Sequence, residues 1–465
     1  MPVRITSLLI THQYTIFTSR RYVSLRNHNR YTVAMSSLEE SIKAVYDANL
    51  RHHGKLTYTV PSPDTYPFQW FWDSCFHAIT LSYIDVERAK NELRLLVTGQ
   101  FQNGMIPHIM YWKMPVNNPF PEIHWGKRRT SSITQPPMLS LAVWRIYEVT
   151  GDTEFVREML PHIDAFHHYL FRHRDPHHLN LAGIINPDES GEDNSPRFDR
   201  VLGLSDPRHQ FVDNFKARLK LVDDLRAARF VLKNKVDLKH WVYDVPFNAI
   251  LAESLRITST LAQHAGNQVI AMWSDAKAMK VRASMHEIFR HQHLYQSVYG
   301  PRLRHISTRT WAMFMPLYAG VASDAEARYV VENYLLDTRE FALPYAVPTV
   351  SLAEPSFDPS GDWKGDWWVG TNWRGPVWMS TNWFIIQGLL RYGYADEARR
   401  IYYGSLELIK HAGFREYYDP LTGQGHGANN FTWGGLILDM EELIKAAVSR
   451  DKNNHDKTEV AGAKT

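Results

Sequence analysis

Two acidic residues of this chain stand in segments whose composition favours chemistry over simple packing, and the first is Glu416. It lies in the stretch Gly413–Trp433, where two tyrosines, an Asp-Pro turn and a run of alternating glycines follow it. Tyr417 or Tyr418 would orient the carboxylate, and glycines let backbone pass close to a ligand or adopt a positive φ. The alternative is an ordinary loop with an exposed glutamate, which leaves the glycine run unexplained. We therefore hypothesise that Glu416 takes part in catalysis.

The second candidate belongs to a cluster of four carboxylates, Asp188, Glu189, Glu192 and Asp193, within six residues. This density of acids is too high for a helix core and suits a loop. A crowded carboxyl can have a raised pKa and so serve as a general acid. A solvated acidic turn is the alternative. As a calcium loop the stretch lacks the alternating oxygen ligands and the terminal bidentate glutamate of an EF-hand.

Aromatic residues gather in two further segments. Trp70 and Trp72 are two apart, so in extended backbone their rings point the same way, and Asp73 follows at a helix start. This pattern suits a sugar-binding wall, because rings stack on the apolar face of a sugar. Rings in the core, with Asp73 as an N-cap, are the alternative. Residues 363–383 hold six of the 15 tryptophans around Arg374, which can stack on a ring or hold a carboxylate in a bidentate fork.

Composition restricts the class of protein. The net charge of the 465 residues is +3, with both signs interspersed, which argues against a nucleic-acid partner. No apolar run reaches the roughly 18 residues that span a bilayer, so we expect no membrane partner. The only cysteine, Cys75, is expected to be buried and inert, and it fits a reducing, cytoplasmic location. Six of the 23 histidines lie between His162 and His178 without an H-E-x-x-H pattern, so we expect no metal and no cofactor.

The first 35 residues stand apart, with five arginines and no acidic residue before Glu39. This composition suits an organelle-targeting peptide, whereas Met35, directly before a helix-capping sequence, suits an upstream start codon. We expect residues 1–35 to be a disordered extension without a catalytic role. Residues 36–450 are predicted to form the catalytic domain and residues 451–465 a disordered tail.

Helical periodicity recurs from Ser37 almost to Arg450 and predicts about a dozen helices in sequential pairs. The predicted fold class is all-α, an (α/α)6 barrel, that is, a toroid of helix pairs. A superhelical repeat stack is the competitor, but no fixed period of about 34 or 40 residues supports it. A ring would gather the long loops on one face over a central pocket. These loops are Thr57–Trp72, Met110–Pro137, Asp175–Leu204, Ser351–Val377 and Gly413–Thr432.

Six motifs follow one another along nearly the whole chain after residue 37. They are Y-P-F-Q-W-F-W-D (Tyr66–Asp73), N-G-M-I-P-H (Asn103–His108), T-Q-P-P (Thr134–Pro137), E-D-N-S-P-R (Glu192–Arg197), W-R-G-P-V-W (Trp373–Trp378) and E-Y-Y-D-P-L-T-G (Glu416–Gly423). In these motifs the chain resembles glycoside hydrolase family 63, above all its small single-domain mannosylglycerate and glucosylglycerate hydrolases. The trehalases and processing α-glucosidase I are more distant relatives. The resemblance implies an (α/α)6 barrel and hydrolysis of an α-glycosidic bond with inversion.

The resemblance also implies roles for single residues. Asp193 would be the acid that protonates the leaving oxygen, and Glu416 the base that activates water on the opposite face of the sugar. Inversion requires a separation of about 6.5–9.5 Å between the two carboxyl groups, which leaves room for that water. The residues that would line the sugar pocket are Tyr66, Trp70, Trp72, Asp73, His108, Gln135, Trp373, Arg374 and Trp378.

The leaving-group half of the site departs most from the family pattern. Asn372 stands where relatives often carry an aromatic residue. The pair Gly434-Gly435 stands where they often carry small hydroxyl residues. The basic run 127–129 would meet an acidic aglycone such as glycerate, with a solvated basic loop as the alternative. The expected substrate is a small α-glucoside or α-mannoside, most of all glucosylglycerate or mannosylglycerate. A hydrolase of a disaccharide, as in α-glucosidases and trehalases, is the alternative.

Two other classes use the same kind of barrel. A sugar isomerase or epimerase relies on a pair of histidines to move protons, but the densest histidine cluster lies away from the aromatic motifs. A glycan-binding protein without catalysis would keep the tryptophans and would need neither Asp193 nor Glu416. The two carboxylates therefore decide between these classes and a hydrolase.

Overall fold

The computed structural model describes residues 28–113, 125–126, 129–204, 211–230, 238–360 and 373–462. The chain divides into two compact units, Met1–Ser41 and Ile42–Thr465. In the first unit the described residues belong to helix α1 (His28–Ala48), which begins before the domain start predicted at residue 36. No helix in the described ranges combines the length and the apolar character that crossing a membrane requires.

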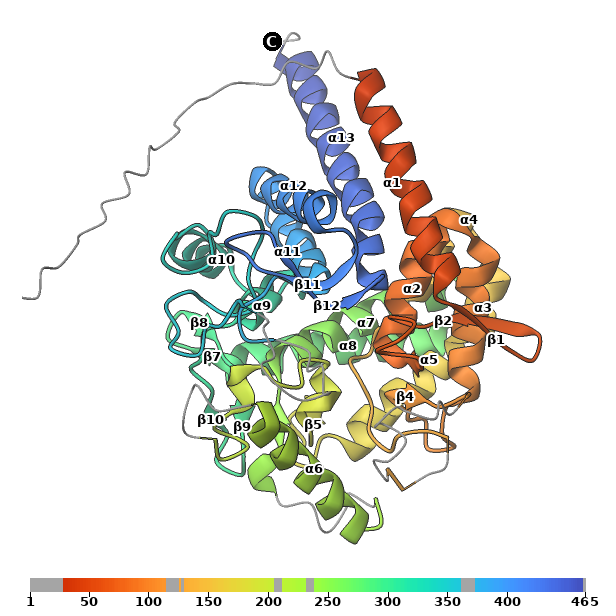
Figure 1. The fold of residues 1–465 in the computed structure, drawn as a ribbon, viewed down its shortest axis with the longest axis vertical. Helices are drawn as coiled ribbons and strands as arrows, with labels where there is room; N and C mark the ends of the chain where they lie inside the picture. Colours follow the sequence, from red (N-terminus) through yellow and green to blue (C-terminus); the bar gives the residue numbers. More distant parts are fainter. Residues whose placement is uncertain are drawn as a thin grey trace, which may run out of the picture. The chain divides into compact units, whose positions relative to one another are not determined.

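Six helices of the second unit contact one another in sequence (Figure 1). Helix α2 packs against α4, α4 against α7, α7 against α9, α9 against α11 and α11 against α13, and α13 returns to α2. This succession closes into a ring, and we call these helices the inner helices. Their bounds are α2 Phe71–Ile84, α4 Leu139–Thr150, α7 Val245–His264, α9 Met315–Tyr318, α11 Met379–Arg391 and α13 Ile437–Gly462.

Four inner helices are each followed by a helix that packs against them, namely α3 (Val86–Thr98), α5 (Thr153–His173), α8 (Gln268–Phe289) and α12 (Ala395–Ala412). The sequence explains the two kinds of helix. Helix α12 buries one face, with Ile401 and Leu408 among its buried residues, as amphipathic periodicity requires. Helix α7 is buried on nearly every side because it is enclosed by neighbours. The protein is mostly helical, and this arrangement fits an α/α barrel.

The strands are short and hold loops together. They form the hairpin β1 (Leu50–His53) with β2 (Leu56–Thr59), and the pairs β3 (Gln69–Trp70) with β4 (Ile109–Met110) and β7 (Arg290–His291) with β8 (Leu294–Tyr295). A four-stranded sheet has the order β10 (Arg304–His305), β9 (Val298–Tyr299), β6 (Val242–Tyr243) and β5 (Gly183–Ile184). All of these pairs are antiparallel.

The glycine-rich stretch after α12 was predicted to be a loop, and it is instead an antiparallel hairpin. Its strands are β11 (Arg415–Tyr418) and β12 (Gly425–Asn429), with a register shift between Arg415 and Tyr417. The alternating strand pattern is hidden because Gly425 and Gly427 replace the side chains that would mark it. An isolated antiparallel bridge between Val377 and Tyr418 joins this hairpin to the segment that leads into α11.

Other elements differ from the sequence prediction in length. The helix expected over Thr308–Leu317 is a 3₁₀ turn, Trp311–Phe314, followed by the four-residue α9. Helix α10 (Asp324–Val330) passes into a π-helical turn, Val331–Leu335. Helix α13 continues to Gly462, whereas residues 451–465 were predicted to be disordered.

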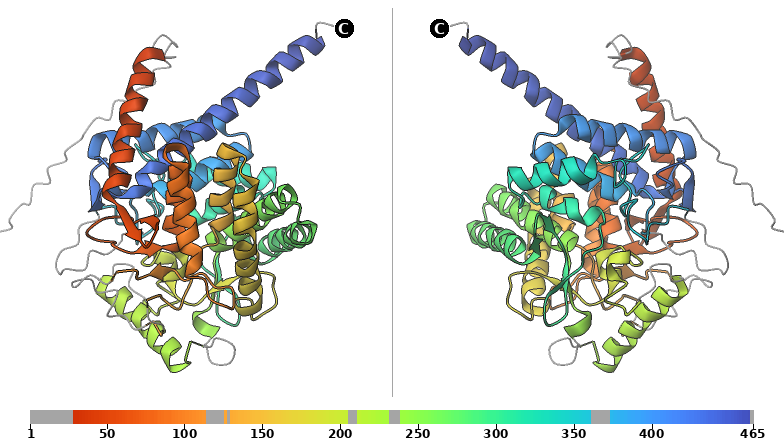
Figure 2. Two further views of the ribbon diagram at one scale, coloured as in Figure 1. Left: turned by 90° about the vertical axis from the view of Figure 1, so that its right-hand side faces the viewer. Right: turned by 90° about the vertical axis from the view of Figure 1, so that its left-hand side faces the viewer.

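Helix α6 (Phe211–Ala227) stands outside the ring of inner helices and lies below it in both views of Figure 2. Its buried residues include Arg218 and Asn214, which are polar. Leu221, Val222 and Leu225 of the same helix are buried too, and Arg218 lies against Asp193.

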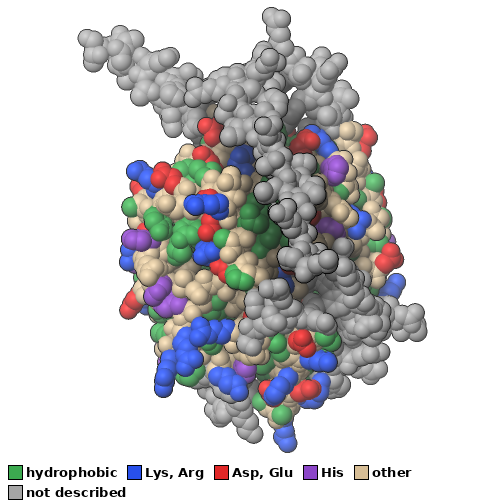
Figure 3. All heavy atoms as spheres, turned by 60° about the vertical axis from the view of Figure 1, so that its left-hand side comes forward, with side chains coloured by type: hydrophobic (Ala, Val, Ile, Leu, Met, Phe, Trp, Pro, Cys, Tyr) green, Lys and Arg blue, Asp and Glu red, His purple; other side chains and the backbone are tan. Residues whose placement is uncertain are grey.

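Two predictions made from composition can be compared with the structure. Cys75 is fully buried, which confirms the predicted burial, and burial raises the pKa of its thiol well above the usual value, which fits an inert thiol. Charged side chains of both signs are interspersed on the face shown in Figure 3, as the net charge of +3 suggests.

Candidate active site

Glu416 lies on strand β11, and two neutral donors hold its carboxylate. The Tyr66 hydroxyl donates to Oε1 at 2.8 Å, and the backbone N–H of Ala428 donates to Oε2 at 2.8 Å. The side chain is buried, with 1% of the residue exposed. Burial raises the pKa of Glu416 to about 8, against the two hydrogen bonds, and the negative charge of Asp193 raises it further. The glutamate is therefore a buried, positioned carboxyl group rather than the exposed residue of an ordinary loop.

The hairpin keeps the backbone against this carboxylate at Gly427. Its φ is +64°, which disfavours any residue with a side chain, and a Cβ built there would lie 2.4 Å from Oε2 of Glu416. The glycine thus brings the next N–H, that of Ala428, to the carboxylate. The sequence predicted that glycines here let backbone pass close to a ligand, and the group approached is the side chain of Glu416 itself.

The tyrosine that orients Glu416 is Tyr66, not one of its two neighbours. The hydroxyl of Tyr418 donates to the backbone oxygen of Gly413 at 2.7 Å. The ring of Tyr417 packs against Trp378, with 5.1 Å between ring centroids. The prediction that Tyr417 or Tyr418 orients the carboxylate is corrected in favour of a residue 350 positions away.

Asp193 lies in the loop between two 3₁₀ turns, Pro187–Ser190 and Pro196–Phe198, and its side chain is 20% exposed. Arg218 of α6 approaches it, with 3.1 Å between Nη2 and Oδ2, and the same guanidinium pairs with Asp188. The charge of Asp193 acts on the pKa of both Glu416 and Tyr66. The two proposed catalytic carboxyl groups are therefore near enough for one charge to act on the other.

The neighbouring acids Glu189 and Glu192 are buried supports of the loop. Arg174 forks onto Glu189 with hydrogen bonds of 2.8 and 2.6 Å, and Arg197 forks onto Glu192 with two of 2.7 Å. The indole N–H of Trp311 donates to Glu192 at 2.8 Å. The alternative of a solvated acidic turn is wrong for these two residues. Their ion pairs fix the loop that presents Asp193.

Tryptophan rings from three segments form one cluster beside Glu416. Trp373 and Trp378 stack at 3.9 Å with an interplanar angle of 6°. Trp433 packs at 5.3 Å from Trp378 and 5.1 Å from Trp72, and its indole N–H donates to Asp73 at 2.8 Å. Trp433 was not among the residues predicted for the site, although it ends the stretch that contains Glu416.

Asp73 is the third residue of α2 and caps no helix, so the N-cap alternative is wrong. The N-cap position is held by Trp70, which ends strand β3, while Trp72 already belongs to the helix. Burial raises the pKa of Asp73 to about 6, against the nearby His77 and the bond from Trp433. Its place in the first turn of α2 favours a negative charge.

Gln135 and His108 connect the aromatic wall to the neighbouring loops. Oε1 of Gln135 accepts from the backbone N–H of Trp72 at 3.1 Å. The ring of His108 lies edge-on to Trp70 at 5.3 Å, with Nδ1 2.6 Å from the Ser131 hydroxyl. Burial lowers the pKa of His108 to about 3, with the charge of Arg218 adding to it, so the ring is neutral. A neutral imidazole offers one donor and one acceptor.

Arg374 binds a carboxylate in the bidentate fork that was one of its two predicted arrangements. Its guanidinium donates to both oxygens of Asp199, at 3.0 and 2.8 Å, and to the backbone oxygen of Asn194 at 3.2 Å. The N–H of Trp373 donates to Oδ1 of Asn194 at 2.8 Å. These bonds tie the tryptophan segment to the residue next to Asp193. A direct contact between Arg374 and a sugar stays a prediction.

Some predicted residues fall outside the described ranges. These are Lys127 and Arg128 of the basic run, Asn372, and the part of the tryptophan segment between residues 361 and 372. Among the described residues no group of three or more His, Cys, Asp or Glu side chains is placed to hold a metal ion.

Residues 66–434 match the model of the mannosylglycerate hydrolase MGH1-like glycoside hydrolase domain. The chain therefore belongs to this family of glycoside hydrolases, and the resemblance to family 63 seen in the six motifs is confirmed.

Relatives with known names cover most of the chain. Mannosylglycerate hydrolase of Thermus thermophilus is 32% identical over 421 residues, which is 83% of this chain and 97% of the relative. Glucosylglycerate hydrolase of Mycolicibacterium hassiacum is 28% identical over 84% of this chain and 95% of the relative. The crystal structure of a family 63 mannosylglycerate hydrolase from Thermus thermophilus, in complex with Tris and D-glycerate, superposes with a TM-score of 0.76. It is 30% identical, and the match covers 88% of this chain and all of that one.

Proposed function

We propose that this protein is an inverting hydrolase of a small α-glycoside, glucosylglycerate or mannosylglycerate, and that it releases the free sugar and glycerate. The observation that carries the proposal is the pair of carboxyl groups, Glu416 held by Tyr66 and Ala428, and Asp193 acting on it through space. The names of the relatives supply the two sugars and the glycerate.

In the proposed reaction Asp193 gives its proton to the glycosidic oxygen while the bond from that oxygen to the anomeric carbon breaks. A water on the opposite face attacks the anomeric carbon and gives a proton to Glu416. The products are a sugar of inverted anomeric configuration and the alcohol of the leaving group. This scheme needs carboxyl groups about 6.5–9.5 Å apart, enough for the water between them.

The leaving group lies on the side of the acid, because the acid protonates the oxygen that departs. Arg218 lies on this side, beside Asp193, and its side chain is 6% exposed. A glycerate carboxylate would meet the guanidinium that now pairs with Asp188 and Asp193. We propose Arg218 as the contact for the acidic aglycone, a role that sequence analysis gave to the basic run 127–129.

For the fold we propose an (α/α)6 barrel in residues 36–450 that carries the site on one face. The closed succession of inner helices supports it, as does the packing of α3, α5, α8 and α12 against them. The loops named from the sequence meet through hydrogen bonds such as Tyr66 to Glu416 and Trp373 to Asn194. Cys75, buried and reduced, fits the cytoplasmic location that we propose.

The experiment is a screen of glucosylglycerate, mannosylglycerate, trehalose and a kojibiose-type disaccharide by proton NMR, which shows the sugar cleaved and the anomer released first. We expect the β-anomer first from an α-glycoside. Asp193→Ala and Glu416→Ala should each nearly abolish hydrolysis, whereas Glu407→Ala, which removes an exposed acid of α12, should not. Full activity in either site variant, or an α-anomer appearing first, would refute the proposal. Cleavage of a disaccharide alone would favour the α-glucosidase or trehalase-like alternative.

A further inference from the structure

A cavity of about 570 Å³ lies among the inner helices away from the carboxyl pair. The tryptophan cluster meets the beginnings of α2 and α11, at Trp72 and Trp378. The cavity is lined by residues further along the same helices, such as Ile79 of α2 and Gln387 of α11. At 1.5 Å per residue, Gln387 lies about 13 Å along α11 from Trp378. The cavity is therefore separate from the candidate active site.

One wall of this cavity holds a carboxylate with three arginines. Glu253 of α7, with 5% of its side chain exposed, receives hydrogen bonds from Arg256 at 2.7 Å and from Arg391 of α11 at 2.7 Å. Arg282 of α8 reaches its other oxygen at 3.3 Å. Arg256 and Arg391 line the cavity, whereas Arg282 does not. A single carboxylate cannot neutralise three guanidinium groups.

The carboxylate of Glu253 is fully committed to these arginines. Burial acts to raise the pKa of Glu253, but the bonds and charges of Arg256 and Arg391 outweigh it and lower the pKa below its usual range. The group is therefore ionised at neutral pH, and the wall still carries a surplus of positive charge. Partly buried cations in mutual repulsion are stabilised by an added anion.

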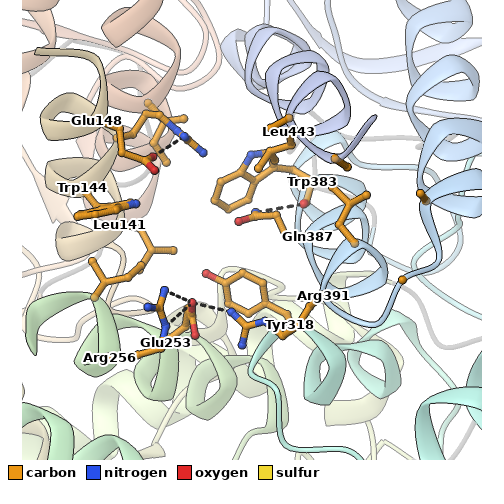
Figure 4. A pocket seen from close by; sticks show the side chains of 18 residues that line it. Leu141, Trp144, Glu148, Glu253, Arg256, Tyr318, Trp383, Gln387, Arg391 and Leu443 are labelled. Atoms are coloured by element: carbon orange, nitrogen blue, oxygen red, sulfur yellow. Dashed lines mark hydrogen bonds and ion pairs between the residues drawn. The ribbon is translucent and has the colours of Figure 1, made fainter. Parts of the chain in front are cut away.

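Hydrogen-bond donors remain available on this wall. Arg391 uses one of its N–H groups on Glu253, so the rest of its guanidinium can meet a ligand. The Tyr318 hydroxyl forms no hydrogen bond with any other described residue, although Tyr318 is only 2% exposed. Figure 4 shows this hydroxyl pointing into the open centre of the cavity, beside Arg391 and Glu253.

The opposite wall is suited to the body of a ligand rather than to its charge. Trp144 and Leu141 of α4 face the cavity there (Figure 4). The third arginine of the lining, Arg145, is already paired with Glu148 and with Asp439 at 2.6 Å from its Nε. Positive charge is thus in surplus around Glu253, while the ring of Trp144 across the cavity can pack against an uncharged part of a ligand.

We propose that this cavity binds a small organic anion, a carboxylate or a phosphate monoester. Arg391, Arg256 and the Tyr318 hydroxyl hold the anionic group, and the body of the ligand rests against Trp144. The site goes beyond the proposed hydrolysis and does not depend on it, because none of these residues belongs to the carboxyl pair or the tryptophan cluster.

The test is calorimetric titration of the full chain with two probes, inorganic phosphate and gluconate. We expect saturable binding of at least one probe. Arg391→Gln should weaken it about tenfold or more, since a hydrogen bond to a charged group is lost. Tyr318→Phe, which keeps the ring, should weaken it about threefold or more. The matched control is Arg282→Gln, which also removes one arginine from Glu253 but none from the lining, and it should change binding less than about twofold.

The outcomes separate the possibilities. Binding of phosphate alone supports a phosphate monoester, and binding of gluconate alone supports a sugar acid. Absence of saturable binding by both probes overturns the proposal. Equal weakening by Arg282→Gln and Arg391→Gln also overturns it. Unchanged affinity in Tyr318→Phe does so too, and this variant keeps the aromatic ring and its packing, so it remains informative if the arginine variants fold poorly. Binding retained in Glu416→Ala shows that the probe does not occupy the candidate active site, and its loss overturns the proposal.

Discussion

Replacing Tyr66 by Phe removes one hydroxyl and tests how Glu416 is held. That hydroxyl donates to Oε1 of Glu416 at 2.8 Å inside the protein, so it stabilises the ionised carboxylate and lowers its pKa. Without the bond the pKa of Glu416 must rise from its value of about 8. The aromatic ring stays in place, because Phe keeps the edge contacts with Trp70 and Phe431.

The size of the effect follows from the bond. A hydrogen bond to a charged group contributes about 1.5–3 kcal/mol, and about 1.4 kcal/mol corresponds to one pKa unit. The acidic limb of kcat/KM, which reports the base of the free enzyme, should therefore move upward by about one unit or more. At pH 7 the ionised fraction of Glu416 falls from about one tenth to about one hundredth, so kcat/KM should drop about tenfold.

The measurement is kcat/KM against pH with the substrate that the proton NMR screen identifies. The loss in Tyr66→Phe should shrink as the pH rises above the new pKa, because the ionised base is then restored. Tyr418→Phe is the matched control, since its hydroxyl bonds to the backbone of Gly413 and should leave the limb in place. If the acidic limb of the kcat/KM profile does not shift in Tyr66→Phe, or shifts toward lower pH, then Tyr66 does not stabilise the ionised carboxylate of Glu416.

Two further substitutions test the supports of the site. Gly427→Ala places a Cβ 2.4 Å from Oε2 of Glu416 at a φ of +64°. We therefore expect kcat, measured by initial rates, to fall at least about tenfold, and the stability, measured by thermal unfolding, to fall by about 1 kcal/mol or more. A wild-type kcat would contradict this. Glu189→Ala leaves Arg174 buried without its carboxylate and should lower the free energy of unfolding by about 3–5 kcal/mol in urea; a loss below about 1 kcal/mol would contradict it.

The helices could be predicted because their burial is periodic along the sequence. The stretch Ala395–His411 was expected to be helical, and α12 runs over Ala395–Ala412, since its apolar residues recur on one face. Helix α9 could not be predicted in its true length. Its residues, Met315–Tyr318, are all buried, so no period distinguishes a short inner helix from the buried 3₁₀ turn before it.

The members of the candidate site were named from the sequence, but the contacts that connect them could not be. Glu416 and Asp193 were named from their local composition and from family motifs, yet the bond from Tyr66 joins positions 350 apart, and no local pattern encodes it. Arg218 gave no signal either, because an arginine on an amphipathic helix is normally solvated, and only tertiary packing turns it toward Asp193. Strand β12 was hidden because glycines stand where alternating side chains would have marked it.

The separation of 350 positions between Tyr66 and Glu416 also has a consequence for biosynthesis. At translation rates of about 5–20 residues per second, the ribosome adds Glu416 roughly 20–70 s after the tyrosine that donates to it. Until then Trp72 lacks Trp433, and α2 lacks the helix that closes the ring, so the nascent chain presents apolar surface that chaperones recognise. Premature termination before Glu416 would yield a product with Asp193 but without Glu416, and with an unclosed edge prone to aggregation.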